Sequence, residues 1–216
     1  MVEGDFCMKK LLHIIATPRR DDSRTLQVSR AFLDGVKKKY TGCAVDTLNL
    51  FTETLPELVS KSVEGKYLLL SGKDLVGEYK TAWKNILQCI KRFLAADAYL
   101  ISTPMWNFGI PYRLKHYIDV ILQPKYLFTY TPQGFEGLVK DKKMVIITSR
   151  GGDYSPGTPM FAYDRLEPYL RTVFGFVGIT DLEFINAQPM DAAGADVMKI
   201  KLQDARKYAT ELAKNF

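Results

Sequence analysis

The sequence predicts an α/β protein built on one parallel β-sheet with helices on both faces. Short apolar runs alternate with longer amphipathic stretches along the 216-residue chain, which is the pattern of consecutive strand–helix–strand units. Such units join parallel strands through right-handed crossovers and bury both faces of the sheet. Since no repeat, low-complexity tract or linker interrupts the pattern, we expect a single domain over residues 8–216, preceded by a loose extension over residues 1–7.

Five apolar segments are expected to form the sheet. The first, LLHIIA, and the third, AYLIS, are each followed by a Thr-Pro pair that ends the run. In chain order the predicted strands are 11–16, 43–50, 98–102, 144–148 and 179–185. A small separate hairpin is expected where residues 128–130 and 135–138 flank Pro132-Gln133-Gly134, because Pro and Gly mark turns.

Helices are expected between these strands. Two helices fill the segment between the second and third strands, because Ser71-Gly72 is a signal that stops one helix before the next begins. The predicted helices are 23–39, 56–70, 75–95, 111–122, one that includes 165–174, and 195–214.

Composition is that of an ordinary soluble globular protein, with 47% hydrophobic and 25% charged residues. The formal net charge of +6 (30 − 24) favours anionic ligands. The basic runs at 37–39 and 140–143 are interpreted as solvated helix and loop ends, so nucleic-acid binding is not favoured. The first seven residues include Glu3 and Asp5 and lack the apolar stretch of a signal peptide. No apolar run is long enough to span a membrane. We therefore expect a soluble, cytoplasmic protein.

Cysteine and histidine usage argues against a metal site, a disulfide framework or a catalytic triad. Cys7, Cys43 and Cys89 are scattered and form no CxxC pair. His13 lies inside the first predicted strand, where a core position is expected, and His116 lies on a helix, where a surface or interface position is expected. Neither has a nucleophile at a recognisable spacing. We therefore expect a bound cofactor to supply the chemistry.

The loop after the first strand, TPRRDDSRT, has the character of an anion site. Ligands of open parallel sheets bind beyond the carboxyl ends of the strands, and a helix N-terminus favours an anion. Thr17, Ser23 and Thr25 bring hydroxyl groups there, and Arg24 brings charge. Because neither GxGxxG nor GxxxxGK[ST] is present, a mononucleotide phosphate fits better than a dinucleotide. The alternative is that Asp22 or Ser23 only caps the helix.

Two further loops stand beside it. TPMWNFGIP after the third strand places Met105, Trp106 and Phe108 in a turn, where a flat apolar ligand would explain them, and Asn107 can both donate and accept hydrogen bonds. The alternative is an aromatic loop that covers the core or forms an interface. SRGGDYSPG after the fourth strand allows close backbone approach at 151–152, although it would also suit an ordinary glycine turn.

With these loops identified, the sequence resembles the FMN-dependent NADH azoreductases, also called FMN-dependent NADH:quinone oxidoreductases, of the flavodoxin-like superfamily. The most specific stretch is PMWNFGIPYRLKHYID at 104–119. Three further motifs follow in the family's order, FxYTxxGxEGL at 128–138, SRGG at 149–152 and TVFGFVGITD at 172–181. The resemblance implies a five-stranded parallel sheet of order 2-1-3-4-5 and a homodimer whose active site lies near the subunit interface.

The resemblance and the loop positions together assign the site residues. The expected FMN-binding residues are Thr17, Ser23, Arg24, Thr25, Pro104, Met105, Trp106, Asn107, Phe108, Ser149, Arg150, Gly151, Gly152 and Tyr154. Tyr130 and Phe176 are expected at the nicotinamide or substrate pocket, partly from the neighbouring subunit. The charged stretch 19–22 departs from the family's pattern.

The mechanism that the resemblance implies is a ping-pong reaction. NADH, with NADPH as the alternative donor, passes hydride to flavin N5, and a quinone or azo compound then receives two electrons. Three alternatives remain open at this point. The acceptor could be a nitroaromatic compound or a metal complex, the protein could be a flavin-bound electron carrier or sensor without NADH turnover, or it could be a basic nucleic-acid binder.

Overall fold

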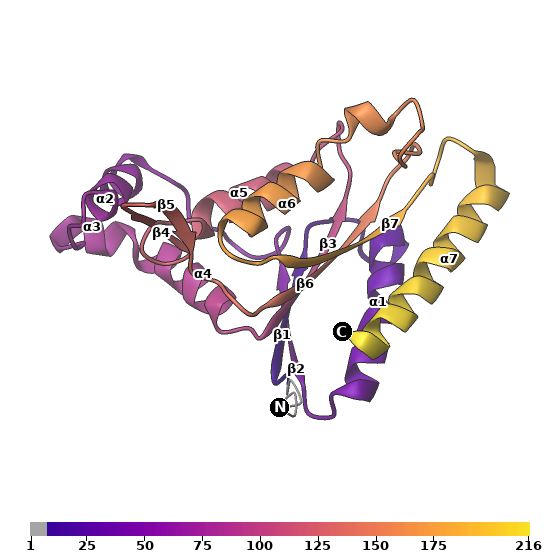
Figure 1. Ribbon diagram of the computed structural model, residues 1–216, viewed down its shortest axis with the longest axis horizontal. Coiled ribbons are helices and arrows are strands. Elements are labelled where there is room, and N and C mark those ends of the chain that lie inside the picture. Colours follow the sequence, from indigo (N-terminus) through magenta and orange to yellow (C-terminus); the bar gives the residue numbers. More distant parts are fainter. Residues whose placement is uncertain (1–7) are drawn as a thin grey trace.

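A computed structural model describes residues 8–216 and contains the expected parallel sheet (Figure 1). Its five strands lie in the order β2-β1-β3-β6-β7, and all neighbours are parallel. This is the predicted flavodoxin-like order 2-1-3-4-5, because β4 and β5 form a separate antiparallel pair. The strands are β1 Lys10–Ile15, β2 Ala44–Asn49, β3 Ala98–Pro104, β4 Phe128–Thr131, β5 Gly134–Gly137, β6 Lys143–Ser149 and β7 Asp181–Ala187. The expected loose extension at 1–7 lies outside the described residues.

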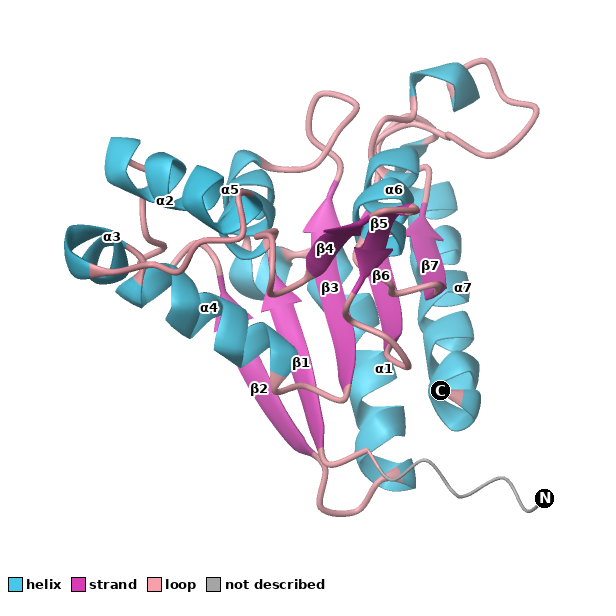
Figure 2. Ribbon diagram, turned by 60° about the vertical axis from the view of Figure 1, so that its left-hand side comes forward, coloured by secondary structure: helices cyan, strands magenta, loops and turns pink. Residues whose placement is uncertain are grey.

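Helices cover both faces of the sheet, as expected. Figure 2 shows α1 and α7 on one face, with α4, α5 and α6 on the other. The helices are α1 Arg24–Lys39, α2 Ser60–Leu70, α3 Gly77–Ala82, α4 Lys84–Leu94, α5 Tyr112–Ile121, α6 Glu167–Phe176 and α7 Gly194–Asn215, with 3-10 turns at Arg20–Asp22 and Phe161–Tyr163. Among residues 8–216, no helix is both long and apolar enough to cross a lipid bilayer.

Successive side chains of each strand point to opposite faces of the sheet, so the hydrophobic core has two parts, one on each face. In β1, Leu11 packs on the side of α1 and α7, whereas Leu12 and Ile14 pack on the other side. The central strand β3 is buried along nearly its whole length. Each fully buried aliphatic or aromatic side chain stabilises the fold by about 1.5–3 kcal/mol, so the sheet is a rigid base for the loops at its edge.

α1 and α7 approach each other closely. A Cβ atom on Gly35 would lie 2.5 Å from the Cβ of Ala213, so only glycine allows this helix separation. At the far end of α1, the Tyr40 hydroxyl donates to the carbonyl oxygen of Phe216 at 2.6 Å. The C-terminal helix therefore fixes the position of α1 and, with it, the loop that enters α1.

Several predicted boundaries were wrong. α2 begins at Ser60 rather than at residue 56, because Val59 is still extended. The expected helix over 75–95 is divided at Trp83, whose buried indole donates to the Ser62 carbonyl at 2.9 Å. β3 continues through Pro104, which pairs with Ser149. Proline is tolerated there because β1 has already ended, and no strand on that side needs its missing N–H.

Candidate functional site

A pocket of about 230 Å³ lies at the carboxyl ends of β1, β3 and β6. It is the place where the three loops predicted to bind a ligand meet. Its lining residues are Thr17, Arg19, Ser23, Arg24, Pro104, Met105, Trp106, Ser149, Arg150, Gly151, Met190 and Asp191. Most of the residues expected to bind the cofactor therefore line one pocket, although they come from separate parts of the chain.

The first wall is the N-terminus of α1. Ser23 caps the helix, because its Oγ accepts from the Leu26 N–H at 3.3 Å. The helical ladder begins with the bond from the Gln27 N–H to the Ser23 carbonyl at 3.0 Å. The N–H groups of Arg24 and Thr25 precede that bond, at the positive end of the helix dipole. The two interpretations of Ser23 are thus compatible, since it caps the helix and also lines an anion-favouring pocket.

The second wall is the base of the aromatic loop after β3. Trp106 and Gly109 exchange two backbone hydrogen bonds, at 2.9 and 3.0 Å. Between them, Asn107 and Phe108 have φ values of 47° and 68°. Left-handed backbone suits Asn but costs a residue such as Phe about 1–2 kcal/mol. The tight turn leaves Asn107 and Phe108 exposed at its tip, beyond the pocket wall that Met105 helps to form.

The third wall is the glycine loop after β6, and in it Arg150 has an unexpected role. Its side chain is only 1% exposed, and its guanidinium lies 2.7 Å from Asp164 and 3.5 Å from Glu167. Its Nε donates to the Thr148 hydroxyl at 3.0 Å. Arg150 is therefore a buried, paired cation that holds the loop in place. A buried guanidinium of this kind is costly to leave unpaired, so it is not a free charge for a ligand.

Five predicted FMN-binding residues do not line this pocket. Thr25 lies directly behind its wall, where its hydroxyl is 2.7 Å from that of Ser149. Gly152 and Tyr154 lie further along the loop, and the Tyr154 N–H donates to Gln188 Oε1 at 3.2 Å. Asn107 and Phe108 stand at the exposed tip of the aromatic loop.

The two predicted substrate residues lie in another aromatic cluster, at the β4–β5 hairpin. The Phe176 ring centroid is 4.4 Å from that of Phe135 and 4.8 Å from that of Phe128. Tyr130, beside this cluster, is 65% exposed. Within one chain the structure does not bring Tyr130 or Phe176 into the pocket wall.

The sequence interpretation missed Arg19, which lies in the charged stretch after β1. It also missed Met190 and Asp191, which complete the pocket from the loop after β7. No hydroxyl-rich or glycine-rich pattern singles out this loop. Its position after the last strand was the available signal, because every strand of a parallel sheet ends at the same edge.

A chain of buried hydrogen bonds runs beneath the pocket. The Ser29 hydroxyl donates to the Thr25 carbonyl at 2.9 Å and lies 2.6 Å from the Ser102 hydroxyl. Ser102 must then donate to Ser29, and His13 Nε2, 2.7 Å from Ser102, must donate to Ser102. His13 is therefore a buried donor in its Nε2–H form, and the expected core position of His13 is confirmed.

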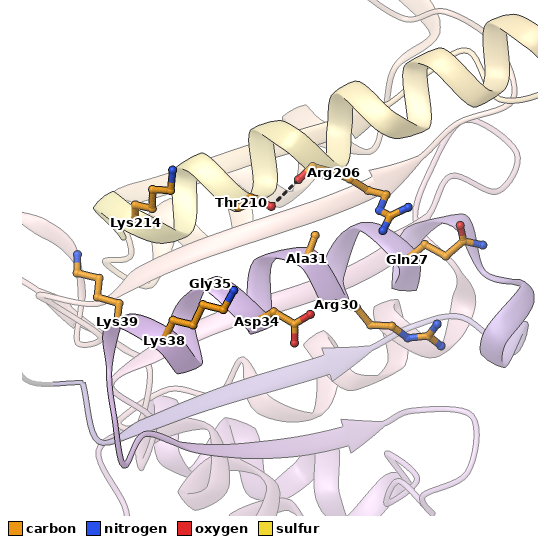
Figure 3. A pocket seen from close by; sticks show the side chains of 10 residues that line it. All are labelled: Gln27, Arg30, Ala31, Asp34, Gly35, Lys38, Lys39, Arg206, Thr210 and Lys214. Carbon is orange, nitrogen blue, oxygen red and sulfur yellow. Dashed lines mark hydrogen bonds between the residues drawn. The ribbon is translucent and has the colours of Figure 1, made fainter.

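Another hollow, of about 1040 Å³, lies between α1 and α7 (Figure 3). Basic side chains such as Arg206 and Lys38 border it, but none of the predicted site residues lies there. It runs along two helices instead of at the strand ends. Over residues 8–216, no group of three or more His, Cys, Asp or Glu side chains is placed to hold a metal ion.

The chain matches a known protein family and curated proteins over most of its length. A protein family described by its flavodoxin-like fold matches residues 9–212. An FMN-dependent NADH:quinone oxidoreductase of Nitratidesulfovibrio vulgaris is 35% identical, over 97% of this chain and 100% of its own length. One from Nostoc punctiforme is 37% identical, over 87% of this chain and 91% of its own length.

Solved structures give the same result. An azoreductase from Bacillus anthracis superposes with a TM-score of 0.87 at 29% identity, over 97% of this chain and all of that one. An FMN-dependent NADH-azoreductase from the same species, in complex with FMN, gives a TM-score of 0.84 at 28% identity, over 96% of this chain and 99% of that one.

The buried state of His13 generates a prediction about stability and pH. Burial lowers the pKa of His13 from 6.5 to about 4. Between these values the unfolded chain binds a proton that the folded chain does not, so the free energy of unfolding falls as the pH falls, by up to about 3 kcal/mol. We expect His13→Gln to remove this component of the pH dependence, as measured by urea unfolding from about pH 7 to about pH 4.5.

His116→Gln is the matched control, because the His116 ring is only partly buried and bonds a carbonyl of a loop, that of Pro56 at 2.9 Å. This variant keeps His13, so the component of the pH dependence that His13 contributes is expected to remain. An identical pH dependence in His13→Gln and wild type would contradict the role of His13.

Proposed function

This chain belongs to the family of FMN-dependent NADH:quinone oxidoreductases with a flavodoxin-like fold, and we propose that it uses NADH to reduce quinones and azo compounds through FMN bound at the strand ends. The observation that carries the proposal is the convergence of an anion-favouring helix terminus, an aromatic loop and a glycine loop on one pocket. A phosphate and a flat ring system need these features together.

The residues fit the two ends of FMN. Thr17, Ser23 and Arg24 would hold the phosphate at the N-terminus of α1. Met105 and Trp106 would cover the ring, which is apolar over its faces. When bound, FMN would supply the two-electron chemistry, with NADH and the acceptor using one site in turn in a ping-pong cycle. The chain itself would bind, orient and shield the cofactor.

We further propose that polar contacts to the ring edge come from the loop tips. Asn107 would provide both a donor and an acceptor. The backbone of Gly151 and Gly152 would approach the ring closely because glycine has no side chain, and Ser149 would contribute its backbone beside them. Thr25 would not contact the ring; it would position Ser149 through the 2.7 Å hydrogen bond between the two hydroxyl groups.

In one chain, the end of the pocket proposed to hold the flavin ring is open to solvent. We propose that a second copy of the chain covers this end. The pocket volume of about 230 Å³ is below the roughly 300–1,000 Å³ of typical small-molecule sites. Trp106 and Phe108 are 37% and 46% exposed beside it. Clustered exposed aromatic side chains mark interaction surfaces. In a homodimer, Tyr130 and Phe176 would reach the partner's cofactor and shape its substrate pocket.

The catalytic cycle can be tested by visible absorption. Purified protein incubated with FMN should show a flavin spectrum that bleaches on anaerobic addition of NADH and recovers when a quinone is added. Flavin that binds but does not respond to NADH or NADPH would indicate a carrier or sensor. A protein that binds no FMN would contradict the proposed function.

Asn107→Ala tests the contact to the ring edge. Loss of one hydrogen-bonding side chain is expected to raise the Kd for FMN by roughly tenfold or to shift the flavin midpoint potential. Asn85→Ala, on α4 away from the pocket, is the control and should change neither quantity. Unchanged affinity and potential in Asn107→Ala would rule out this role of Asn107.

Sedimentation analysis tests the proposed dimer. The wild type should sediment as a dimer, and Tyr130→Asp should shift it towards monomer with reduced quinone reduction, because a charge in an apolar interface loses its hydration. Tyr208→Asp alters an exposed tyrosine of α7 and should remain dimeric. A fully active wild-type monomer would exclude the shared site.

A further inference from the structure

An ion pair crosses the end of the pocket where an anion is expected to bind. Nη1 of Arg24 lies 2.7 Å from Oδ1 of Asp191, and both residues line the pocket. The Arg24 side chain is 25% exposed and that of Asp191 is 67% exposed. A carboxylate oxygen thus occupies the hydrogen-bonding position that a phosphate oxygen would take on this guanidinium.

The backbone, rather than this ion pair, places Asp191 at the pocket. The N–H groups of Asp191 and Ala192 both donate to the Gly151 carbonyl at 3.0 Å, and the Met190 N–H donates to the Arg150 carbonyl at 2.9 Å. The loop after β7 is therefore fixed against the glycine loop. The backbone of Asp191 would therefore stay at the rim if the ion pair opened, while its side chain could turn away from Arg24.

Few cations in the pocket are available to bind an anion, so the ion pair between Arg24 and Asp191 affects anion binding. Arg150 is already paired with Asp164 inside the protein, which leaves Arg19 and Arg24 to attract an anion. Asp191 is the one carboxylate among the described lining residues, and it takes one of these two cations. An anionic ligand must therefore compete with an internal anion for Arg24.

We propose that Asp191 is an internal competitor for Arg24 that lowers the affinity of the pocket for the phosphate group of its ligand. The inference rests on the proposed function, which makes that ligand FMN. On binding, the phosphate would displace the Asp191 carboxylate towards solvent, where an already exposed side chain is readily rehydrated. Asp191 would thereby reduce the preference for FMN over riboflavin, which has no phosphate.

The test is the affinity of the cofactor-free protein for FMN and for riboflavin, measured by quenching of flavin fluorescence. Asp191→Asn keeps the size of the side chain and removes its charge. We expect the Kd for FMN to fall roughly tenfold, with the Kd for riboflavin unchanged. Asp191→Ala should behave in the same way. Asp196→Asn, an exposed carboxylate in the first turn of α7, should leave both constants unchanged.

A double-mutant cycle identifies the partner of Asp191. In an Arg24→Gln background, Asp191→Asn should no longer improve FMN binding, because the contested cation is gone. An undiminished improvement in that background would overturn the competition for Arg24. So would an unchanged or weaker affinity for FMN in Asp191→Asn alone, or an equal change for riboflavin. Failure of the wild type to bind either flavin would instead contradict the proposed function.

Discussion

The hydrogen bonds at the end of β6 are the interaction on which the rest of the site depends. The Ser149 carbonyl accepts from the Met105 N–H at 2.9 Å, so the loop after β3 leaves the sheet attached to β6. The Ser149 hydroxyl contacts that of Thr25 in α1, and the Arg150 N–H donates to the Ala187 carbonyl in β7 at 3.0 Å. One strand end thereby sets the positions of all the pocket walls, and preorganisation of this kind avoids an entropic cost on binding.

The sequence was sufficient for the fold and for the general position of the site. Apolar runs and their Pro and Gly boundaries mark the strands, and the strand-end rule brings three loops together before any coordinates are known. The sequence was insufficient where contacts between distant residues decide the role of a side chain or the end of a helix. Nothing local distinguishes Arg150, which is buried on Asp164, from Arg24, which faces the pocket. The break in the helix at Trp83 likewise depends on an indole that reaches a distant carbonyl.

The positive charge of the chain is not concentrated at its site. Some basic side chains border the groove between α1 and α7, such as Lys38, while the buried Arg150 is neutralised by Asp164. The anion end of the pocket thus depends on a helix terminus and two arginines, with one carboxylate opposing them. The helix terminus and the two arginines lie at one end of the pocket, an arrangement that suits a ligand with its charge at one end only.

The left-handed conformation of Phe108 has a consequence for protein engineering. The backbone at this position is one that glycine adopts without strain. Replacing Phe108 with glycine would therefore release about 1 kcal/mol of local strain, while removing an aromatic surface next to the pocket. Selection for thermal stability alone would favour that replacement, and selection for turnover would oppose it. Under the FMN-binding role proposed for this loop, thermostability and activity would therefore make opposite demands on position 108.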